Sequence, residues 1–212
     1  MGEHLGEIYH SLWNECALLH MRWDEFVMMF GKDQEQFDVM NQVAPGFFMS
    51  AKDALWESIL LHLCRFADPY RVAHRQTLSL EALLNCQASQ SIPDLRSLVA
   101  DAKSKIKFAQ DWRNRALAHL DLEHALEKTA QPLAPASRLR VKEALLAISM
   151  TLQSVENHFT GVELGFGGVA YNFGGSHLLS ELRLIAQLRQ ERDQRIYSGA
   201  GTADDFDHKK WH

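Results

Sequence analysis

The side chains best suited to chemistry lie together in one stretch of the chain, DWRNRALAHLD at residues 111–121. The helical pattern puts Arg113 on the same face of its helix as the apolar Ile106. Arg113 therefore occupies a position where the pattern predicts a buried apolar residue. At 100° per residue, Arg113 and His119 lie about 60° to either side of Ala116 and about 9 Å apart along the axis. We therefore expect a guanidinium, which can hold a phosphate, and an imidazole, which can move a proton, to face one crevice.

A buried arginine needs either a carboxylate partner or a function that uses its charge, because burying an unpaired cation is costly. If Arg113 has a purely structural role, it should form an ion pair within the chain. The candidate carboxylates are Asp111, Asp121 and the isolated Asp68. The Arg113 to His119 spacing is not informative by itself, since arginine and histidine are frequent enough here to produce it by chance.

A metal site is the competing chemistry, because four potential ligands follow closely on one another at His119, Asp121, Glu123 and His124. This pattern leaves open a metal-dependent enzyme built on a four-helix bundle. No HExxH pair or second matching cluster completes such a site, so the sequence predicts neither a metal nor another cofactor.

Several basic side chains precede or share this stretch, although the chain as a whole has a net charge of −5. The charge excludes a protein that coats nucleic acid by bulk attraction but leaves room for a local basic groove. Of these side chains, Lys107 and Arg115 are our candidates for RNA binding, while solvated lysines on a helix face remain the simpler explanation. Trp112 is expected to pack rather than stack on a base. The basic residues are Lys103, Lys105, Lys107 and Arg115.

Helical periodicity dominates the sequence and predicts an all-α bundle of five or six helices. Helices are expected over residues 5–30, 47–66, 77–85, 93–119, 137–158 and 176–195. In the first, one apolar row consists of Leu5, Leu12, Leu19 and Phe26. The glycine-rich segment 161–175 is expected to form a short loop or hairpin before the last helix. We expect one domain over residues 1–197 and a flexible tail over 198–212.

The remaining composition is that of an ordinary cytoplasmic protein. No apolar run is long enough to span a bilayer, and the N-terminus has no secretory signal. Cys16, Cys64 and Cys86 show no paired spacing and lie in apolar patterns, so they are expected to be reduced core residues. His20 and His62 lie near apolar faces and are likewise expected to be structural.

The stretch with Arg113, Asn114 and His119 resembles the arginine, polar residue and histidine motif of the HEPN superfamily of helical domains. More narrowly, the chain is similar to the AbiU-like abortive-infection branch over about residues 1–160. The segments that carry this similarity are LCRFAD at 63–68, LSLEALL at 78–84, WRN at 112–114 and AHLD at 118–121. Within the first of these, Arg65 and Asp68 are expected to pair and fix the end of their helix.

The resemblance implies an up-and-down bundle that forms a homodimer, in which the motifs of both protomers meet. It implies a metal-independent endoribonuclease of a phage-defence or toxin–antitoxin system, with RNA as substrate and a cognate antitoxin or defence-system protein as a further partner. Arg113 and His119 would be catalytic and Asn114 would orient one of them. The alternative is a non-catalytic domain of the same fold that binds RNA or another protein.

Overall fold

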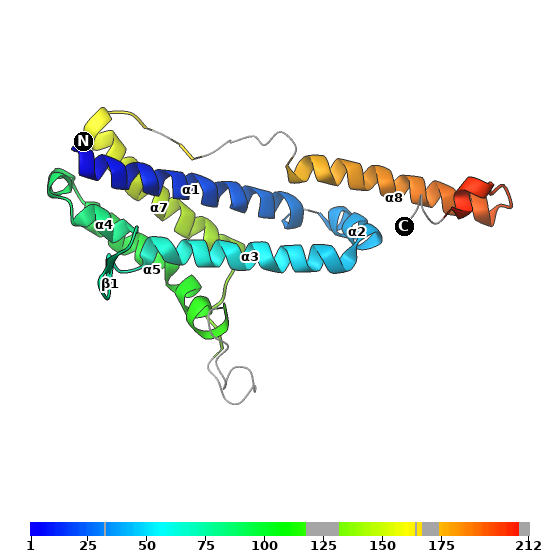
Figure 1. Ribbon diagram of the computed structural model, residues 1–212, viewed down its shortest axis with the longest axis horizontal. Helices are drawn as coiled ribbons and strands as arrows, with labels where there is room; N and C mark the ends of the chain where they lie inside the picture. The colour runs from blue at the N-terminus through cyan, green and yellow to red at the C-terminus, as the bar shows by residue number, and fades with distance from the viewer. Residues whose placement is uncertain (32, 118–131, 164, 167–173, 208–212) are drawn as a thin grey trace. The chain divides into compact units, whose positions relative to one another are not determined.

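The chain folds almost entirely into helices (Figure 1). The computed structural model describes residues 1–31, 33–117, 132–163, 165–166 and 174–207. The contacts of the chain divide it into two units, each of which is described by itself. Unit 1 comprises Met1–Trp23 and Leu55–Val169, and unit 2 comprises Asp24–Ala54 and Ala170–His212. The predicted all-α fold class is confirmed.

Unit 1 contains the stretch singled out by its chemistry. Its elements are most of α1 (Glu3–Phe30), the second part of α3 (Pro45–Ala67), β1 (Arg71–Val72), β2 (Arg75–Gln76), α4 (Leu80–Leu84), the 3-10 helix η1 (Gln87–Ser91), α5 (Leu95–Trp112), the π-helix η2 (Arg113–Leu117) and α7 (Arg138–Thr160). Figure 1 shows α3 running in the opposite direction to α1, and α7 in the opposite direction to α5, as in an up-and-down bundle.

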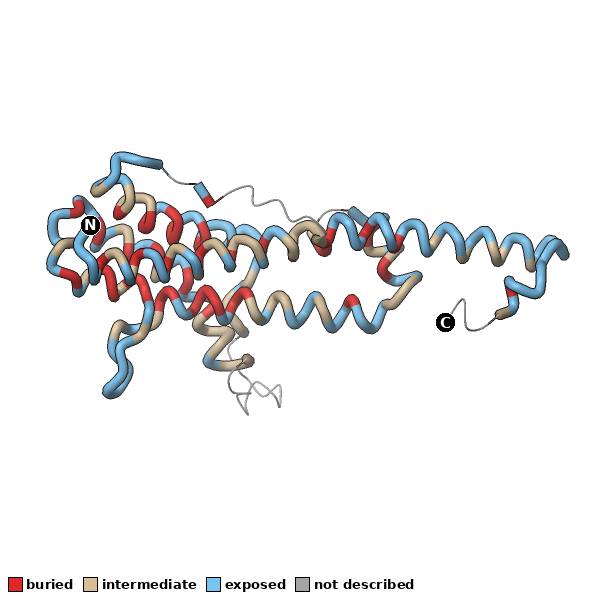
Figure 2. The backbone as a smooth tube through the Cα atoms, turned by 45° about the horizontal axis from the view of Figure 1, so that its top comes forward, coloured by how far each residue is buried: buried red, intermediate tan, exposed pale blue. Residues whose placement is uncertain are grey.

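The apolar rows of the helices in unit 1 face one another and make its core. In α1 the predicted row is buried at Leu5, Leu12 and Leu19, each at most 2% exposed. Val99 and Ile106 of α5 are buried to the same degree, as are the apolar residues at the same spacing on α7. Figure 2 shows these buried positions recurring along each helix. Helical periodicity therefore predicted the core-facing sides of these helices correctly.

Two local features end α3 and lead to α5. Pro69 follows directly after Asp68, and proline disfavours helical backbone in the residue before it, so α3 stops at Ala67. The chain then makes the β1–β2 hairpin, in which Arg71 is opposite Gln76. The hairpin strands are short and exposed, and the periodicity of the sequence did not predict them. The result is that Asp68 is held directly after the last turns of α3, which are largely buried.

The described part of unit 2 contains two helices that the sequence did not predict, α2 (Gln34–Val43) and the 3-10 helix η3 (Ala203–Phe206). Helix α8 (Gly175–Tyr197) is also complete in this unit. Helix α2 buries only Gln36 and Met40, which is too weak a pattern to stand out in the sequence. It packs against α8, whose N-terminal amide at Gly175 donates to the Glu25 carboxylate at 2.7 Å. The glycine-rich segment before α8 is only partly described, because residues 164 and 167–173 lie outside the described residues.

A buried histidine links α1 to α3 in unit 1. His62 is 2% exposed; its Nε2 lies 2.7 Å from Oε2 of Glu15, and its Nδ1 accepts a 3.0 Å hydrogen bond from Arg22. Arg65 approaches the same Glu15 oxygen at 3.6 Å. The prediction that His62 is a core residue is confirmed, and His20 likewise bonds Ser149 at 2.9 Å. Burial, which penalises the charged imidazolium, lowers the pKa of His62 below its ordinary 6.5, and Arg22 and Arg65 act in the same direction.

This lowered pKa predicts a loss of stability in acid. In the unfolded chain His62 binds a proton near pH 6.5, whereas in the folded protein it resists protonation until a lower pH. The free energy of unfolding should therefore fall as the pH drops below about 6.5, by up to about 1.4 kcal/mol per pH unit for one proton. Urea unfolding from pH 7.5 to 5.5 measures this. His62→Gln should flatten the dependence, while the exposed-site variant His10→Gln should keep it; the reverse result would contradict the assignment.

Candidate functional site

The motif stretch begins where α5 changes its helical form. Helix α5 ends at Trp112, and residues Arg113–Leu117 continue as a π-helix. Such single-turn π segments are frequent at functional sites. A π-helix has more residues per turn than an α-helix, so the geometry predicted for Arg113 and His119 on a regular α-helix does not apply to this segment. His119 itself, like Asp121, lies outside the described residues.

Arg113 is held at the end of α5 by two partners. Its Nη1 donates to Oδ1 of Asp68 at 2.6 Å, and its Nε donates to Oδ1 of Asn114 at 3.1 Å. The hydrogen bond that Arg113 donates to Asp68 raises the pKa of its guanidinium above the usual value. Of the three carboxylates considered in the sequence, Asp68 is therefore the partner that the structure provides.

The Arg113 side chain is only partly buried, which explains why the apolar row tolerates it. It is 28% exposed and its partner Asp68 is 27% exposed, whereas Ile106, two turns earlier in the same row, is fully buried. The expectation that Arg113 occupies a fully buried position was thus wrong, because this face of the helix is no longer covered by the core where α5 ends. Within the described part of the chain, Nη2 of Arg113 has no hydrogen-bond partner. The guanidinium is thus oriented by protein contacts and still reachable from solvent.

The residues flanking Arg113 anchor the chain that leads into α7. The carboxylate of Asp111 accepts a 2.8 Å hydrogen bond from the backbone amide of Ala134 and lies 3.5 Å from Nη1 of Arg115. The indole of Trp112 donates to the carbonyl of the same Ala134 at 2.7 Å. Trp112 therefore packs, as predicted, and part of the charge of Arg115 is already compensated by Asp111.

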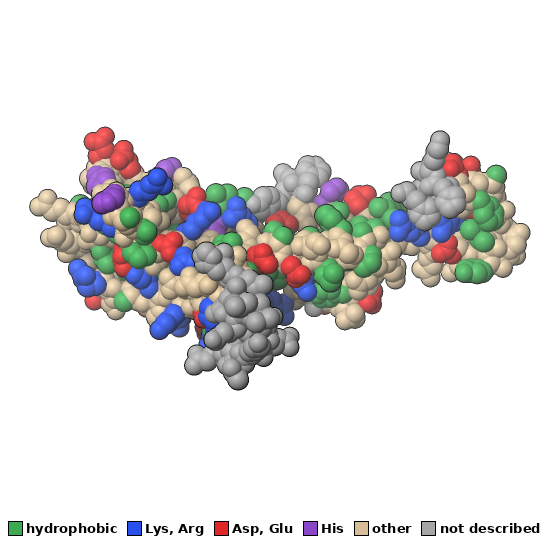
Figure 3. Space-filling model, turned by 60° about the horizontal axis from the view of Figure 1, so that its bottom comes forward, with side chains coloured by type: hydrophobic (Ala, Val, Ile, Leu, Met, Phe, Trp, Pro, Cys, Tyr) green, Lys and Arg blue, Asp and Glu red, His purple; other side chains and the backbone are tan. Residues whose placement is uncertain are grey.

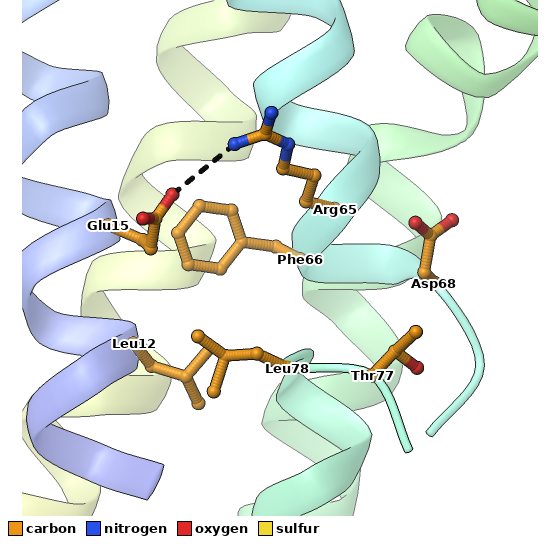
Figure 4. A pocket seen from close by; sticks show the side chains of 7 residues that line it. All are labelled: Leu12, Glu15, Arg65, Phe66, Asp68, Thr77 and Leu78. Atoms are coloured by element: carbon orange, nitrogen blue, oxygen red, sulfur yellow. Dashed lines mark ion pairs between the residues drawn. The ribbon is translucent and has the colours of Figure 1, made fainter. Parts of the chain in front are cut away.

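Arg65 and Asp68 do not pair with each other, contrary to expectation. Asp68 bonds Arg113, and Arg65 contacts Glu15. Both line a pocket of about 260 Å³ in unit 1, whose apolar wall includes Phe66. Figure 4 shows the Arg65–Glu15 pair on one side of Phe66 and Asp68 at the end of α3, separate from that pair. Two opposite charges three residues apart suggested a local pair, but each side chain instead has a tertiary partner, Glu15 of α1 for Arg65 and Arg113 for Asp68.

The lysines of α5 differ in their surroundings. Lys103 makes an ion pair with Glu81 of α4, and this hydrogen bond is the main reason that the pKa of Glu81 is lowered. Lys105 and Lys107 are exposed and line a depression between α5 and α7, together with Arg140. The contribution of Arg140 was not visible in the sequence, because it belongs to a helix 33 residues away from Lys107.

Neither the cysteines nor the other potential ligands form a metal site in the described part of the chain. All three cysteines are buried and free, as predicted, and burial raises the pKa of Cys64, close to Arg113, to about 11. The part of the chain that is described contains no group of three His, Cys, Asp or Glu side chains able to hold a metal ion. The four potential ligands at residues 119–124 lie outside it. None of the helices in the described regions is long and apolar enough to cross a membrane.

Comparison with known families assigns the chain. The family model HEPN_AbiU2, described as AbiU2, matches residues 2–174. The chain belongs to the AbiU-like branch of the HEPN superfamily. The AbiU2 match covers both Arg113 and Asp68 and ends directly before α8, which begins at Gly175. No curated protein and no solved structure matches the chain.

Proposed function

We propose that this AbiU2-family protein is a metal-independent endoribonuclease that acts in phage defence or as a toxin in the cytoplasm. The observation that carries the proposal is the state of Arg113: two fixed contacts orient its guanidinium, yet more than a quarter of the side chain remains exposed. A guanidinium in this state is suited to a phosphate, which it binds through two parallel hydrogen bonds. His119, the histidine of the motif, is the proposed group that transfers protons.

The proposed reaction is attack of a ribose 2′-oxygen on the adjacent phosphorus. As a base, imidazole accepts the 2′-hydroxyl proton while the bond from O2′ to phosphorus forms, and the bond to O5′ breaks as that oxygen gains a proton. His119 carries out one or both of these transfers. Arg113 stabilises the charge on the phosphoryl oxygens in the transition state. The products are a 2′,3′-cyclic phosphate and a 5′-hydroxyl.

The proposal assigns supporting roles to the two partners of Arg113. Asn114 accepts from Nε and fixes the plane of the guanidinium, and Asp68 fixes its direction from the end of α3. Neither partner needs to touch the substrate. The active form is a homodimer in which both motifs meet, and a cognate antitoxin or defence partner would control it. Arg115 and Lys107 are the proposed RNA contacts beside the motif.

One observation favours a second candidate function. The Arg113–Asp68 pair is also what a purely structural arginine would form, because each charge satisfies the other. The alternative is therefore a non-catalytic HEPN domain that binds RNA or a protein partner.

A cleavage assay in chelator separates these possibilities. Purified protein is incubated with single-stranded RNA in excess EDTA, and its mass in solution is measured under the same conditions. The proposal predicts cleavage by a dimer that is unaffected by EDTA. Binding without turnover would favour the non-catalytic domain, and cleavage abolished by EDTA would point to the metal-dependent alternative.

Asp68→Asn tests the positioning role of the carboxylate. We expect kcat for RNA cleavage to fall about tenfold with KM little changed, since a misplaced guanidinium weakens the transition state more than binding. The free energy of unfolding should change by less than about 1 kcal/mol, because the ion pair is partly exposed to solvent. The matched control is Glu81→Gln, which removes the charge from a similarly exposed ion pair away from the motif. Equal kinetics for the two variants would contradict the role of Asp68.

A further inference from the structure

A depression of about 480 Å³ lies between α5 and α7 in unit 1, on the side that Lys105 and Lys107 share. Its volume is in the range of sites that hold small molecules or single units of a polymer. Asp111 lines it and is only two residues from Arg113. Lys107 precedes Arg113 by six residues, about 9 Å along a helix. At 100° per residue the two side chains also lie about 120° apart around the helix, so a strand that binds at both must curve around α5 to reach this depression.

The charges that line the depression favour an anion. Lys105, Lys107 and Arg140 are three cations, and the acidic side chains are Asp111 and Glu143. Asp111 is already compensated, because it accepts from the Ala134 amide and lies beside Arg115. One carboxylate, that of Glu143, is thus left to offset three cations.

Arg140 is exposed, and one aromatic contact restrains its guanidinium. Its guanidinium carbon lies 5.8 Å from the centre of the Phe108 ring, which is itself buried. A cation above an aromatic face is attracted by it and loses conformational freedom before any ligand binds. Arg140 is therefore oriented in advance at the wall of the depression opposite Lys107.

A local excess of positive charge can attract a polyanion even though the whole chain is acidic. On the face drawn in Figure 3, basic and acidic side chains are interspersed, and the described part of that face carries no continuous basic strip. Surface charges act over about 10 Å at ordinary salt, so a polyanion responds to the local cluster and not to the net charge of −5. Lys103 does not add to the cluster, since it pairs with Glu81.

We propose that the depression between α5 and α7 is a second phosphate-binding subsite for the RNA strand, formed by Lys105, Lys107 and Arg140. This inference rests on the proposed function, because it assigns the backbone of the same RNA to a site beside the motif. Phosphate contacts of this kind give affinity and register but no sequence preference.

The test measures binding separately from cleavage. A fluorescent single-stranded RNA with 2′-O-methyl groups throughout cannot undergo 2′-oxygen attack, and its affinity is measured by anisotropy over a series of salt concentrations. The test variant is Lys107→Gln with Arg140→Gln. The control is Lys103→Gln with Lys142→Gln, which removes the same charge from the same two helices outside the depression.

We expect the test variant to bind about tenfold more weakly than the control. The slope of log affinity against log salt should fall by about 0.7 for each phosphate that the variant no longer binds. Equal affinities and slopes for the two variants, or no binding by the wild-type protein, would overturn the inference. So would tighter binding of an acidic peptide than of RNA. A protein that binds in this way without cleaving unmethylated RNA would overturn the proposed function alone.

Discussion

Replacing His119 by alanine is expected to lower the rate of RNA cleavage by about 10²- to 10⁴-fold, the usual contribution of a general acid or base. The imidazole is the group in the motif that can both accept and release a proton near neutral pH. Binding of the 2′-O-methyl RNA should change much less, because the phosphate contacts come from other side chains. The measurement is the single-turnover cleavage rate of each variant at equal protein concentration.

The matched control is His124→Ala, which also removes an imidazole from the same segment. In the proposed mechanism His124 has no role, so its variant should retain wild-type activity. In the metal-dependent alternative both histidines are candidate ligands. Both variants would then lose activity, and EDTA would abolish the activity of the wild-type protein. Equal cleavage by the His119→Ala variant and the wild-type protein would remove His119 from the mechanism.

Replacing Arg113 by lysine is expected to lower kcat by about 10²- to 10³-fold, as the loss of a donor to a developing oxyanion typically does. Lysine keeps the positive charge but lacks the planar fork. The single ammonium group of lysine can pair either with Asp68 or with a phosphate oxygen. Arg113 instead uses Nη1 and Nε for its protein contacts and keeps the remaining edge of the guanidinium accessible to a phosphate.

The corresponding control is Arg96→Lys, the same exchange at an exposed position near the start of α5. We expect it to leave kcat and KM unchanged. For the Arg113 variant, KM should stay within a few-fold of the wild-type value because the other phosphate contacts persist. Full activity of Arg113→Lys would contradict a role for the fork geometry and favour a structural arginine.

Helical periodicity was a reliable guide wherever one helix face meets the core. The rows of α1, α5 and α7 are buried as predicted, because a repeat of 3.6 residues decides which side chains can leave water together. The partner of Arg113 could not be predicted in the same way. Asp68 is 45 residues away in the chain, and only the tertiary fold, which places the residue after α3 beside the end of α5, brings it to 2.6 Å from Arg113.

The missed elements had weak signals in the sequence, with one exception. The π-helix at Arg113–Leu117 and the β1–β2 hairpin have no apolar alternation that would mark them. The short helix η3 does have a signal: Thr202 precedes Asp205 by three residues, and both the amide and the hydroxyl of Thr202 donate to that carboxylate. Arg195 also pairs with Asp205 and holds the pKa of that carboxyl well below its usual range.

The depression between α5 and α7 illustrates what spacing along one helix cannot reveal. Lys103, Lys105 and Lys107 look equivalent in the sequence, yet one pairs with Glu81 and the other two line the same depression as Arg140 of a different helix. The sequence therefore identified the helix that bears the candidate RNA contacts, but the structure was needed to separate its lysines.

The most direct test of the proposed ribonuclease is the chemistry of the RNA ends. Cleavage products made in excess EDTA are analysed for their termini by mass spectrometry and by labelling of free 5′-hydroxyls. Attack by the 2′-oxygen, assisted by His119 and Arg113, predicts a 2′,3′-cyclic phosphate on one fragment and a 5′-hydroxyl on the other. Fragments with a 3′-hydroxyl and a 5′-phosphate would show that water, and not the ribose, attacks the phosphorus, and would contradict the mechanism.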